Sequence, residues 1–367
     1  MSRLADDAVL ALHRELVATP SVSGDERAIA DRLAALLAEH GIEPVRLGDS
    51  LLAIAGEGPL LLLDTHLDTV PPAPGWTLEP FAATRADGKL FGLGANDAKA
   101  SVAAMTAAFL ASLPPPPGIA LGLALVAGEE TRSQGTRDVL DRLAAGGVEI
   151  AGALFGEPTG LDLAVAQKGL LILELATVGE AAHAAHARSL GATNAVRLLA
   201  RDLVALEGVD LGPEHDLLGA TTLEPTVVRA GTARNVVPGE ASAILDVRTT
   251  PALAPEALVA RVRAGLHCEM RVLSDRFAPR ETPAGALLDA AQAARPGARR
   301  YGSATLSDWA LLPHGVPGLK AGPGRSERSH TPDEFVLESE ILDGVRFYEA
   351  LIRGFAAALG QREERSA

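Results

Sequence analysis

One long uncharged run restricts the fold of this chain more than any other feature. Residues 100–128 contain no Asp, Glu, Lys or Arg, and a run of this length is long enough for a membrane-spanning helix. However, the consecutive prolines from Pro114 to Pro117, followed by Gly118, interrupt it, and proline cannot continue a helix. We therefore expect two buried elements instead of a membrane span: a helix of small residues, then an apolar strand.

Composition favours a globular protein with two domains. The chain has 367 residues, which is long for a single hydrophobic core. Hydrophobic residues make up 47% and aromatic residues only 3%, so Leu, Val and Ala must build most of the core. The formal net charge of −14 argues against a nucleic-acid-binding protein, which would present a basic surface.

The cysteine content and the N-terminus restrict the chemistry and the location. Cys268 is the only cysteine, so an intrachain disulfide and a thiolate metal site are both excluded. Any metal must be held by histidines and carboxylates. The acidic N-terminus lacks the apolar segment of a signal peptide, and we expect a cytoplasmic protein without a membrane partner.

In the first part of the chain, helix and strand patterns alternate. Ser23-Gly24-Asp25-Glu26 has the pattern of a capping box and predicts a helix that ends near Gly41. Residues 60–63 and 119–127 are wholly apolar, which is typical of strands covered on both faces. These patterns predict an α/β domain.

The pattern changes near Lys168. Strand patterns occupy residues 169–178, 223–230, 241–248 and 269–273, and helix patterns occupy 194–206 and 255–266. The resulting order, βαββαβ, predicts a small open sheet with two helices on one face. We expect it to be an inserted domain, residues 168–276, between the two parts of the first domain, residues 1–167 and 277–367.

Polar side chains with metal-binding chemistry follow the apolar strands or lie in glycine-flanked loops. Each cluster is weak evidence alone, because such short combinations often occur by chance. Together they offer two histidines and several carboxylates, which are the nitrogen and oxygen donors that two divalent ions need. The clusters are His66-Leu67-Asp68, Asp97, Glu129-Glu130, Glu157 and His330.

The order of these clusters resembles the M20 family of zinc peptidases and deacylases. Asp97 lies in a Gly-x-x-Asp-x-Lys pattern, and Glu157 precedes Pro158. The resemblance covers nearly the whole chain, and residues 75–98 and 329–332 are most similar to acetylornithine deacetylases. It implies a zinc-peptidase-like catalytic domain, with helices on both faces of a mixed sheet. It also implies that the inserted domain is ferredoxin-like and serves as a dimerisation domain and lid.

The resemblance implies two divalent ions, with zinc expected first and cobalt as an alternative. Asp97 would bridge the two ions. His66 and Glu157 would complete the ligands of one ion, and Glu130 and His330 those of the other. A carboxylate that stays off the metal would still be needed to move protons.

Further roles follow from the same resemblance. Asp68 would orient His66, and Glu129 would be the general base, although the residues alone do not distinguish it from Glu130. In the family, the peptide bond after the bridging aspartate is often cis, which here concerns Asp97-Ala98. Gly322 could line the pocket through its backbone, with a plain turn as the alternative reading.

The inserted domain contributes candidates for substrate binding. The resemblance gives His183 the role of a histidine that reaches the partner subunit's active site and helps to bind the oxyanion, with His186 as the alternative. Asn235 and Arg248 would hold the substrate carboxylate. The competing interpretation is that Arg248 forms an ordinary strand-end pair with Asp246.

The predicted function is metal-dependent hydrolysis of an N-acyl amino acid by a homodimer, with N-acetylornithine deacetylation in arginine biosynthesis as the first choice. N-succinyl-diaminopimelate, N-acyl-lysine, N-acylcitrulline and dipeptide substrates remain alternatives. A serine hydrolase is disfavoured because the chain lacks a Gly-x-Ser-x-Gly motif. A non-catalytic binding relative would lack a ligand or the base, and none is missing.

Overall fold

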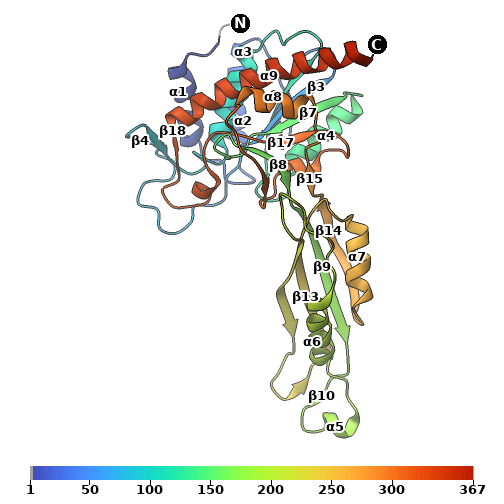
Figure 1. The fold of residues 1–367 in the computed structure, drawn as a ribbon. Coiled ribbons are helices and arrows are strands. Elements are labelled where there is room, and N and C mark those ends of the chain that lie inside the picture. The colour runs from blue at the N-terminus through green and yellow to red at the C-terminus, as the bar shows by residue number, and fades with distance from the viewer. Residues whose placement is uncertain (1–2, 367) are drawn as a thin grey trace. The chain divides into compact units, whose positions relative to one another are not determined.

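Residues 3–366 are described by a computed structural model, in which the chain divides into two units (Figure 1). The main unit comprises Met1–Val165, Thr282–Tyr301 and Ser307–Ala367. The inserted unit comprises Ala166–Glu281 and Gly302–Leu306. The chain therefore leaves the main unit after its first half and returns to complete it.

A mixed sheet forms the centre of the main unit. Its middle strands β6, β3, β7 and β17 run parallel to one another, whereas β1 pairs antiparallel with β2, β2 with β6, and β8 with β17. In spatial order these strands are β1 (Val45–Leu47), β2 (Ser50–Gly56), β6 (Ala120–Val126), β3 (Leu60–His66), β7 (Ile150–Phe155), β17 (Gly318–Lys320) and β8 (Leu163–Gln167). The predicted mixed sheet is confirmed.

Helices cover both faces of this sheet, as predicted. Leu61 and Leu63 of β3 face one core, which includes apolar residues of five helices. Leu60 and Leu62 face the opposite core, with α4 and the short helix η2. This alternation arises because successive strand side chains point to opposite faces. The helices are α1 (Asp6–Ala18), α2 (Arg27–Glu39), α3 (Lys99–Ala111), α8 (Ala286–Ala294) and α9 (Glu338–Ser366) on the first face, and α4 (Gln134–Ala145) and η2 (Asp308–Leu311) on the second.

The uncharged run forms the two predicted buried elements. Helix α3 is buried from Lys99 to Leu110, and β6 is buried along its whole length. The prolines lie between them, outside regular structure. Among the described residues, none of the helices is both long and apolar enough to cross a membrane.

The predicted capping box is wrong, although the helix that it announced is present. Helix α2 begins at Arg27, and its N-cap residue, Glu26, makes no capping hydrogen bond through its side chain. The Glu26 carboxylate instead accepts a hydrogen bond from the Gly24 amide at 2.9 Å. The Ser23 hydroxyl donates to Asp68 at 2.6 Å, so it serves the loop after β3 and not the helix.

The inserted unit has the predicted βαββαβ order (Figure 1). Its antiparallel sheet has the strand order β11-β13-β9-β14. Helices α6 and α7 pack against the apolar side chains on one face, among them Leu171, Leu173 and Leu175 of β9. The elements are β9 (Gly169–Val178), α6 (Ala195–Ala205), β11 (Thr222–Ala230), β13 (Glu240–Thr249), α7 (Pro255–Ala264) and β14 (Glu269–Phe277).

Short elements complete both units. In the inserted unit, β10 (Ala182–His183) pairs with β12 (Val236–Val237), and α5 (Ala187–Leu190) and η1 (Leu206–Gly208) are single turns. In the main unit, β18 (Phe335–Leu337), β5 (Lys89–Phe91) and β4 (Thr84–Ala86) form a small sheet, preceded by η3 (Ser326–Arg328). The strands β15 (Arg280–Glu281) and β16 (Arg300–Ser303) lie where the chain passes between units. Pairing of β18 with β5 brings the segment that follows His330 to the segment that precedes Asp97.

Candidate active site

Three of the predicted clusters lie at one edge of the main sheet. His66 is the last residue of β3, Glu129 and Glu130 follow β6, and Glu157 follows β7. These three strands are parallel neighbours, so their carboxyl ends meet at the same edge. Ligands in α/β proteins bind at this edge. Sequence position after apolar strands therefore predicted which side chains come together.

Two further segments complete the cluster. Asp97 immediately precedes Ala98, the N-cap of α3, and His330 lies in the segment between η3 and β18. One ligand atom from each of His66, Asp97 and Glu130 lies within 4.8 Å of the other two, the spacing of a metal site. His330 Nε2 lies 2.7 Å from Glu130 Oε1. The structure thus gathers residues from five separate stretches of the chain.

The Asp97 carboxylate lies between the two histidines. Its Oδ1 is 3.2 Å from His66 Nε2, and its Oδ2 is 3.9 Å from His330 Nε2. Each oxygen therefore faces a different imidazole. A carboxylate with one oxygen directed to each of two histidines has the arrangement that a bridge between two ions requires. The peptide bond Asp97-Ala98 is cis, as the resemblance implied.

Glu157 and Glu129 belong to the same electrostatic cluster. Burial, together with the charge of Asp97, raises the pKa of the Glu157 carboxyl to about 7. Burial raises the pKa of Glu129 well above its usual value, and His66 opposes this shift while Glu157 adds to it. These mutual effects show that the carboxylates are close together and poorly solvated.

The same carboxylates raise the pKa values of the two histidines in the cluster, because they stabilise a positively charged imidazole. Burial lowers the pKa of His66, but its contacts with Asp68 and Asp97 outweigh burial and leave that pKa well above the ordinary value. The hydrogen bond to Glu130 raises the pKa of His330 to about 9. The surrounding carboxylates thus favour the protonated form of both imidazoles.

Asp68 does more than the predicted orientation of His66. The His66 Nδ1 atom lies 3.0 Å from the backbone carbonyl of Asp68 and 3.5 Å from its Oδ1. The carboxylate itself accepts hydrogen bonds from the backbone amides of Glu129, at 3.0 Å, and Glu130, at 3.1 Å. Asp68 is fully buried. It therefore fixes the loop that carries both glutamates, a role that the sequence pattern did not reveal.

Glu334 was also missed as a site residue, although it lies in the same segment as His330. Its Oε1 accepts hydrogen bonds from the amides of Asn96, at 2.8 Å, and Asp97, at 3.0 Å. The Asn96 side chain donates to the Ser329 hydroxyl at 3.1 Å. These bonds tie the loop before α3 to the late segment. The signal available in the sequence was a glutamate four residues after a candidate ligand.

Gly322 is tightly packed. An added Cβ atom would lie 2.5 Å from Ser101 Oγ and 2.6 Å from the Glu157 carbonyl, so no larger residue fits there. Its carbonyl accepts from the Leu161 amide at 3.0 Å, and its amide donates to Thr159 Oγ1 at 3.2 Å. Close approach of the strand-end loops therefore explains this glycine, and its predicted contact with substrate stays a prediction.

The inserted unit brings two of its candidates together and separates the third. His183 lies next to Asn235, because β10 pairs with β12 and the Ala184 amide donates to the Asn235 carbonyl at 2.8 Å. Both residues are exposed. Their role in substrate binding stays a prediction.

Asn235 and Arg248 lie at opposite ends of the inserted sheet. Asn235 lies just before the start of β13, and Arg248 is near its end, so about 25 Å separates the two ends at 3.3 Å per residue. The Arg248 guanidinium also bonds to Asp246, at 2.8 and 3.2 Å. Within a single chain the two side chains start far apart, and their shared role in holding the substrate carboxylate stays a prediction.

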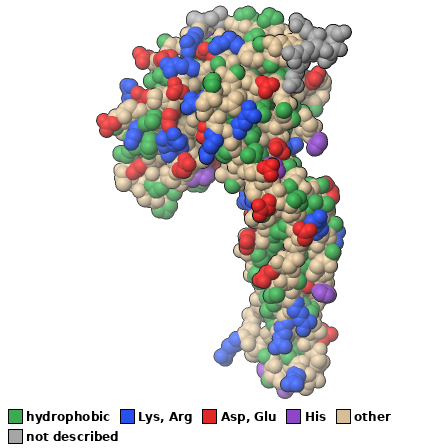
Figure 2. All heavy atoms as spheres, in the orientation of Figure 1, with side chains coloured by type: hydrophobic (Ala, Val, Ile, Leu, Met, Phe, Trp, Pro, Cys, Tyr) green, Lys and Arg blue, Asp and Glu red, His purple; other side chains and the backbone are tan. Residues whose placement is uncertain are grey.

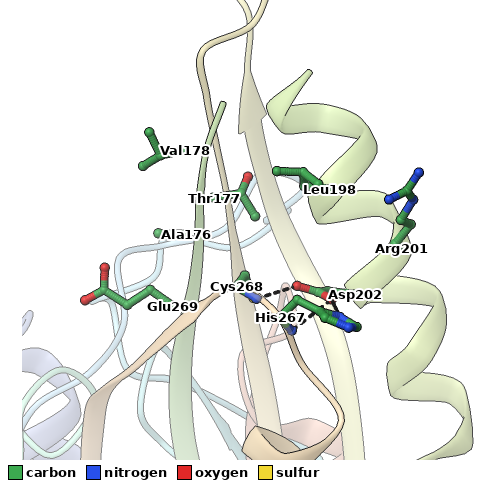
Figure 3. Close-up of a pocket in the computed structure, with 9 residues that line it drawn as sticks. All are labelled: Ala176, Thr177, Val178, Leu198, Arg201, Asp202, His267, Cys268 and Glu269. Carbon is green, nitrogen blue, oxygen red and sulfur yellow. Dashed lines mark hydrogen bonds and ion pairs between the residues drawn. The ribbon is translucent and has the colours of Figure 1, made fainter. Parts of the chain in front are cut away.

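A hollow in the inserted unit contains a Cys, a His and an Asp, but not in a catalytic arrangement (Figure 3). The buried Asp202 carboxylate accepts hydrogen bonds from the amides of His267, at 3.1 Å, and Cys268, at 2.7 Å. Burial, together with Asp202, raises the pKa of the Cys268 thiol to about 12. A thiol that stays protonated is a poor nucleophile. This trio holds the start of β14 in place.

The donor chemistry of the main cluster suits divalent transition metals. Its imidazole nitrogens and carboxylate oxygens are ligands that zinc, cobalt and manganese accept. The cluster offers two histidines and a carboxylate between them, with further carboxylates beside each. The cluster therefore has the composition of a site for divalent metal ions.

Comparison with known proteins gives the family. Residues 62–354 match the family described as Peptidase family M20/M25/M40. The chain belongs to this family and is a metal-dependent amidohydrolase. A succinyl-diaminopimelate desuccinylase of Bordetella petrii is 37% identical over 314 residues, covering 79% of this chain and 81% of the relative. One of Xanthomonas campestris pv. campestris is 33% identical over 375 residues, covering 94% and 98%.

A solved structure supports the fold. The YXEP protein of Bacillus subtilis, described as a dinuclear metal-binding peptidase of family M20, superposes with a TM-score of 0.72 at 19% identity. The match covers 96% of this chain and 98% of that protein. The predicted fold class is confirmed.

The predicted subgroup is not supported. The sequence pattern suggested acetylornithine deacetylases, whereas the relatives described above are desuccinylases. The motifs near the metal site are shared across the family, so they did not distinguish acyl groups.

Metal binding should strengthen as pH rises. His330, with a pKa of about 9, and Glu157, with a pKa of about 7, must lose protons before they can bind an ion. Below each pKa, the apparent dissociation constant should therefore fall about tenfold per pH unit for each displaced proton. Calorimetric titration of metal-free protein with cobalt at pH 6.5, 7.5 and 8.5 would measure this, with proton release read from buffers of different ionisation enthalpy. A His330→Gln variant should release fewer protons, and an affinity that does not change with pH would contradict the prediction.

Proposed function

We propose that this protein removes the acyl group from an N-acylated amino acid, with N-succinyl-diaminopimelate as its preferred substrate. The observation that carries the choice is the identity of 33% to a desuccinylase over nearly the whole of both chains. The clustering of His66, Asp97 and Glu130 supports the reaction class. N-acetylornithine becomes the comparison substrate.

We propose zinc as the metal, held as the sequence predicted. His66 and Glu157 would bind one ion, Glu130 and His330 the other, and Asp97 both. When bound, the ions would lower the pKa of water from about 15.7 to roughly 7 and polarise the amide carbonyl. Cobalt accepts the same donors.

Glu129 is the proposed general base. It lies beside the proposed ligand Glu130, and its side chain interacts electrostatically with His66 and Glu157. In this role its carboxylate takes a proton from the attacking water and delivers it to the nitrogen of the departing amine. Asp68 supports the step by holding the Glu129 and Glu130 amides. A misplaced base would lose most of its effect.

His183 and Asn235 are proposed to contact the substrate in a homodimer. Their adjacency on exposed backbone of the inserted unit supports a shared role. Arg248 is left out, because Asp246 already holds its guanidinium. Gly322 would contribute only through its backbone.

The homodimer is proposed to form through the inserted unit. Strand β11 lies at one edge of its sheet, and Val227 and Val228 are 40% and 58% exposed. An exposed edge strand with apolar side chains is a natural place for another chain to pair. Figure 2 shows further hydrophobic side chains on the visible face of this unit. Exposed examples from the whole unit include Val178, Leu190, Val196 and Val204.

A substrate panel tests the function. Initial rates should be measured with N-succinyl-diaminopimelate, N-acetylornithine, N-acetylcitrulline, N-acetyl-lysine and a dipeptide, with added zinc or cobalt. The kcat/KM for N-succinyl-diaminopimelate should exceed the others about tenfold or more, because pocket contacts to the acyl group change transition-state binding. Chelator treatment should abolish activity, and metal should restore it. A higher kcat/KM for N-acetylornithine would reject the substrate choice, and full activity without metal would reject the mechanism.

The role of Glu129 has its own test in a matched pair of variants. Glu129→Gln should lower kcat about 10²- to 10⁴-fold while keeping the bound metal, because only proton transfer is lost. Glu130→Gln should instead lower the metal content, because a ligand is lost. Steady-state rates and elemental analysis of both variants would measure this. Near-normal turnover by Glu129→Gln would exclude it as the base.

The dimer proposal predicts a mass change on substitution at the sheet edge. Val228→Lys should convert a dimer into a monomer, because it places a charge in an apolar contact. Val272→Lys, at a similarly exposed position on the opposite edge strand β14, is the control and should leave the dimer intact. Light scattering after size-exclusion chromatography would give the masses. A wild-type monomer, or a Val228→Lys dimer, would contradict the proposal.

A further inference from the structure

Asp308 is a buried carboxylate that the sequence motifs did not indicate. It begins the short helix η2 and is 2% exposed. The next residue, Trp309, and the later Leu312 are each 1% exposed in the core behind the sheet. The backbone around Asp308 is therefore anchored by packing.

The Asp308 carboxylate binds the segment that follows the paired glutamates. Its Oδ2 accepts a hydrogen bond from Thr136 Oγ1 at 2.5 Å, across 172 positions of sequence separation. Thr136 is 1% exposed and Asp308 is 2% exposed, so water does not compete for this bond.

The segment from Gly128 to Ser133 is a tight turn that needs external support. The Ser133 amide donates to the Gly128 carbonyl at 2.7 Å, and its hydroxyl lies 3.5 Å from the Glu129 carbonyl. Ser133 has a φ of +53°, in the left-handed region that non-glycine residues rarely adopt. Such a conformation persists only where surrounding contacts hold it.

We propose that Asp308 is a positioning residue that fixes the far end of the turn carrying Glu129 and Glu130, whose beginning is held by Asp68. Asp68 accepts hydrogen bonds from the two glutamate amides, and Asp308 holds Thr136 in the first turn of α4, the helix that begins where this turn ends. Two carboxylates from distant parts of the chain thus clamp one short turn. The effect of Asp308 on catalysis rests on the proposed role of Glu129 as the general base.

The proximity of Asp308 to the site supports this assignment. The Ser133 hydroxyl lies 3.5 Å from the Glu129 carbonyl, and Thr136, which donates to Asp308, is three residues beyond Ser133. A shift of Thr136 would therefore be passed to the short turn that carries the glutamates. Small displacements of a catalytic group have large effects on rate.

Hydrogen exchange tests the clamp independently of any reaction. In Asp308→Ala, the backbone amides of residues 129–134 should exchange about tenfold faster or more, because a charged hydrogen-bond acceptor is lost. Thr136→Val removes the hydroxyl that donates to Asp308 and keeps a similar side-chain volume. It should increase the same exchange rates by a smaller factor, and it provides the test if Asp308→Ala does not fold. Asp138→Asn is the control, because Asp138 accepts only an exposed bond from Gln134 in the same helix. Unchanged exchange in both Asp308→Ala and Thr136→Val would overturn the proposal.

Kinetics separate positioning from plain stability. Asp308→Ala should lower kcat about 10- to 100-fold with KM nearly unchanged, and Asp308→Asn should recover part of the loss because it keeps an oxygen acceptor for Thr136. A lower Tm with normal kcat per folded molecule would overturn the catalytic consequence. If wild-type protein hydrolyses none of the panel substrates, the proposed function fails, and the exchange result still decides whether Asp308 fixes the turn.

Discussion

Like charges held close together in a poorly solvated place repel each other, and the candidate site is built against this repulsion. Glu129 and Glu157 follow strands that end at one sheet edge, and Asp97 lies 3.2 Å from His66 at the end of a third strand there. Burial, with the repulsion from Asp97 added to it, raises the pKa of Glu157 to about 7. Such a group of carboxylates is stable in ionised form only with compensating positive charge. Divalent cations meet that requirement, which connects the electrostatics of the chain directly to its chemistry.

The chain supplies one buried cation of its own at this place. Lys320, in β17, is 2% exposed and interacts electrostatically with Glu157, Glu129 and Asp97. Burial lowers the pKa of Lys320, and the carboxylates oppose that shift. A lysine at the end of a central strand therefore forms part of the charge balance of the site.

Loops that carry reactive groups need support, because loops alone are mobile. Here the support comes from other carboxylates that accept backbone amides. Asp68 holds Glu129 and Glu130, and Glu334 holds the amides of Asn96 and Asp97. In both cases the acceptor comes from a distant stretch of sequence, so the loops become rigid only when the whole main unit has folded.

The sequence by itself determined the fold class and the identity of the clustered residues. Apolar strands such as 60–63 need cover on both faces, and ligands gather where parallel strands end, so His66, Glu130 and Glu157 could be placed without coordinates. The change to a βαββαβ pattern also identified the inserted unit, because the spacing of apolar residues and the order of strands and helices can be read directly along the sequence. Substrate choice could not be read in this way, since the metal-site motifs are common to the family.

Tertiary structure decided the contacts between residues that are remote in sequence. Ser23 donates a hydrogen bond to Asp68 instead of capping the helix that follows it, and Thr136 donates one to Asp308. Long-range packing brings these partners together, so local sequence patterns could not predict either contact. The separation of Asn235 from Arg248 follows likewise from the length of β13. Residue types and their order thus determined what chemistry is present, whereas hydrogen bonds between distant segments decided how it is held in place.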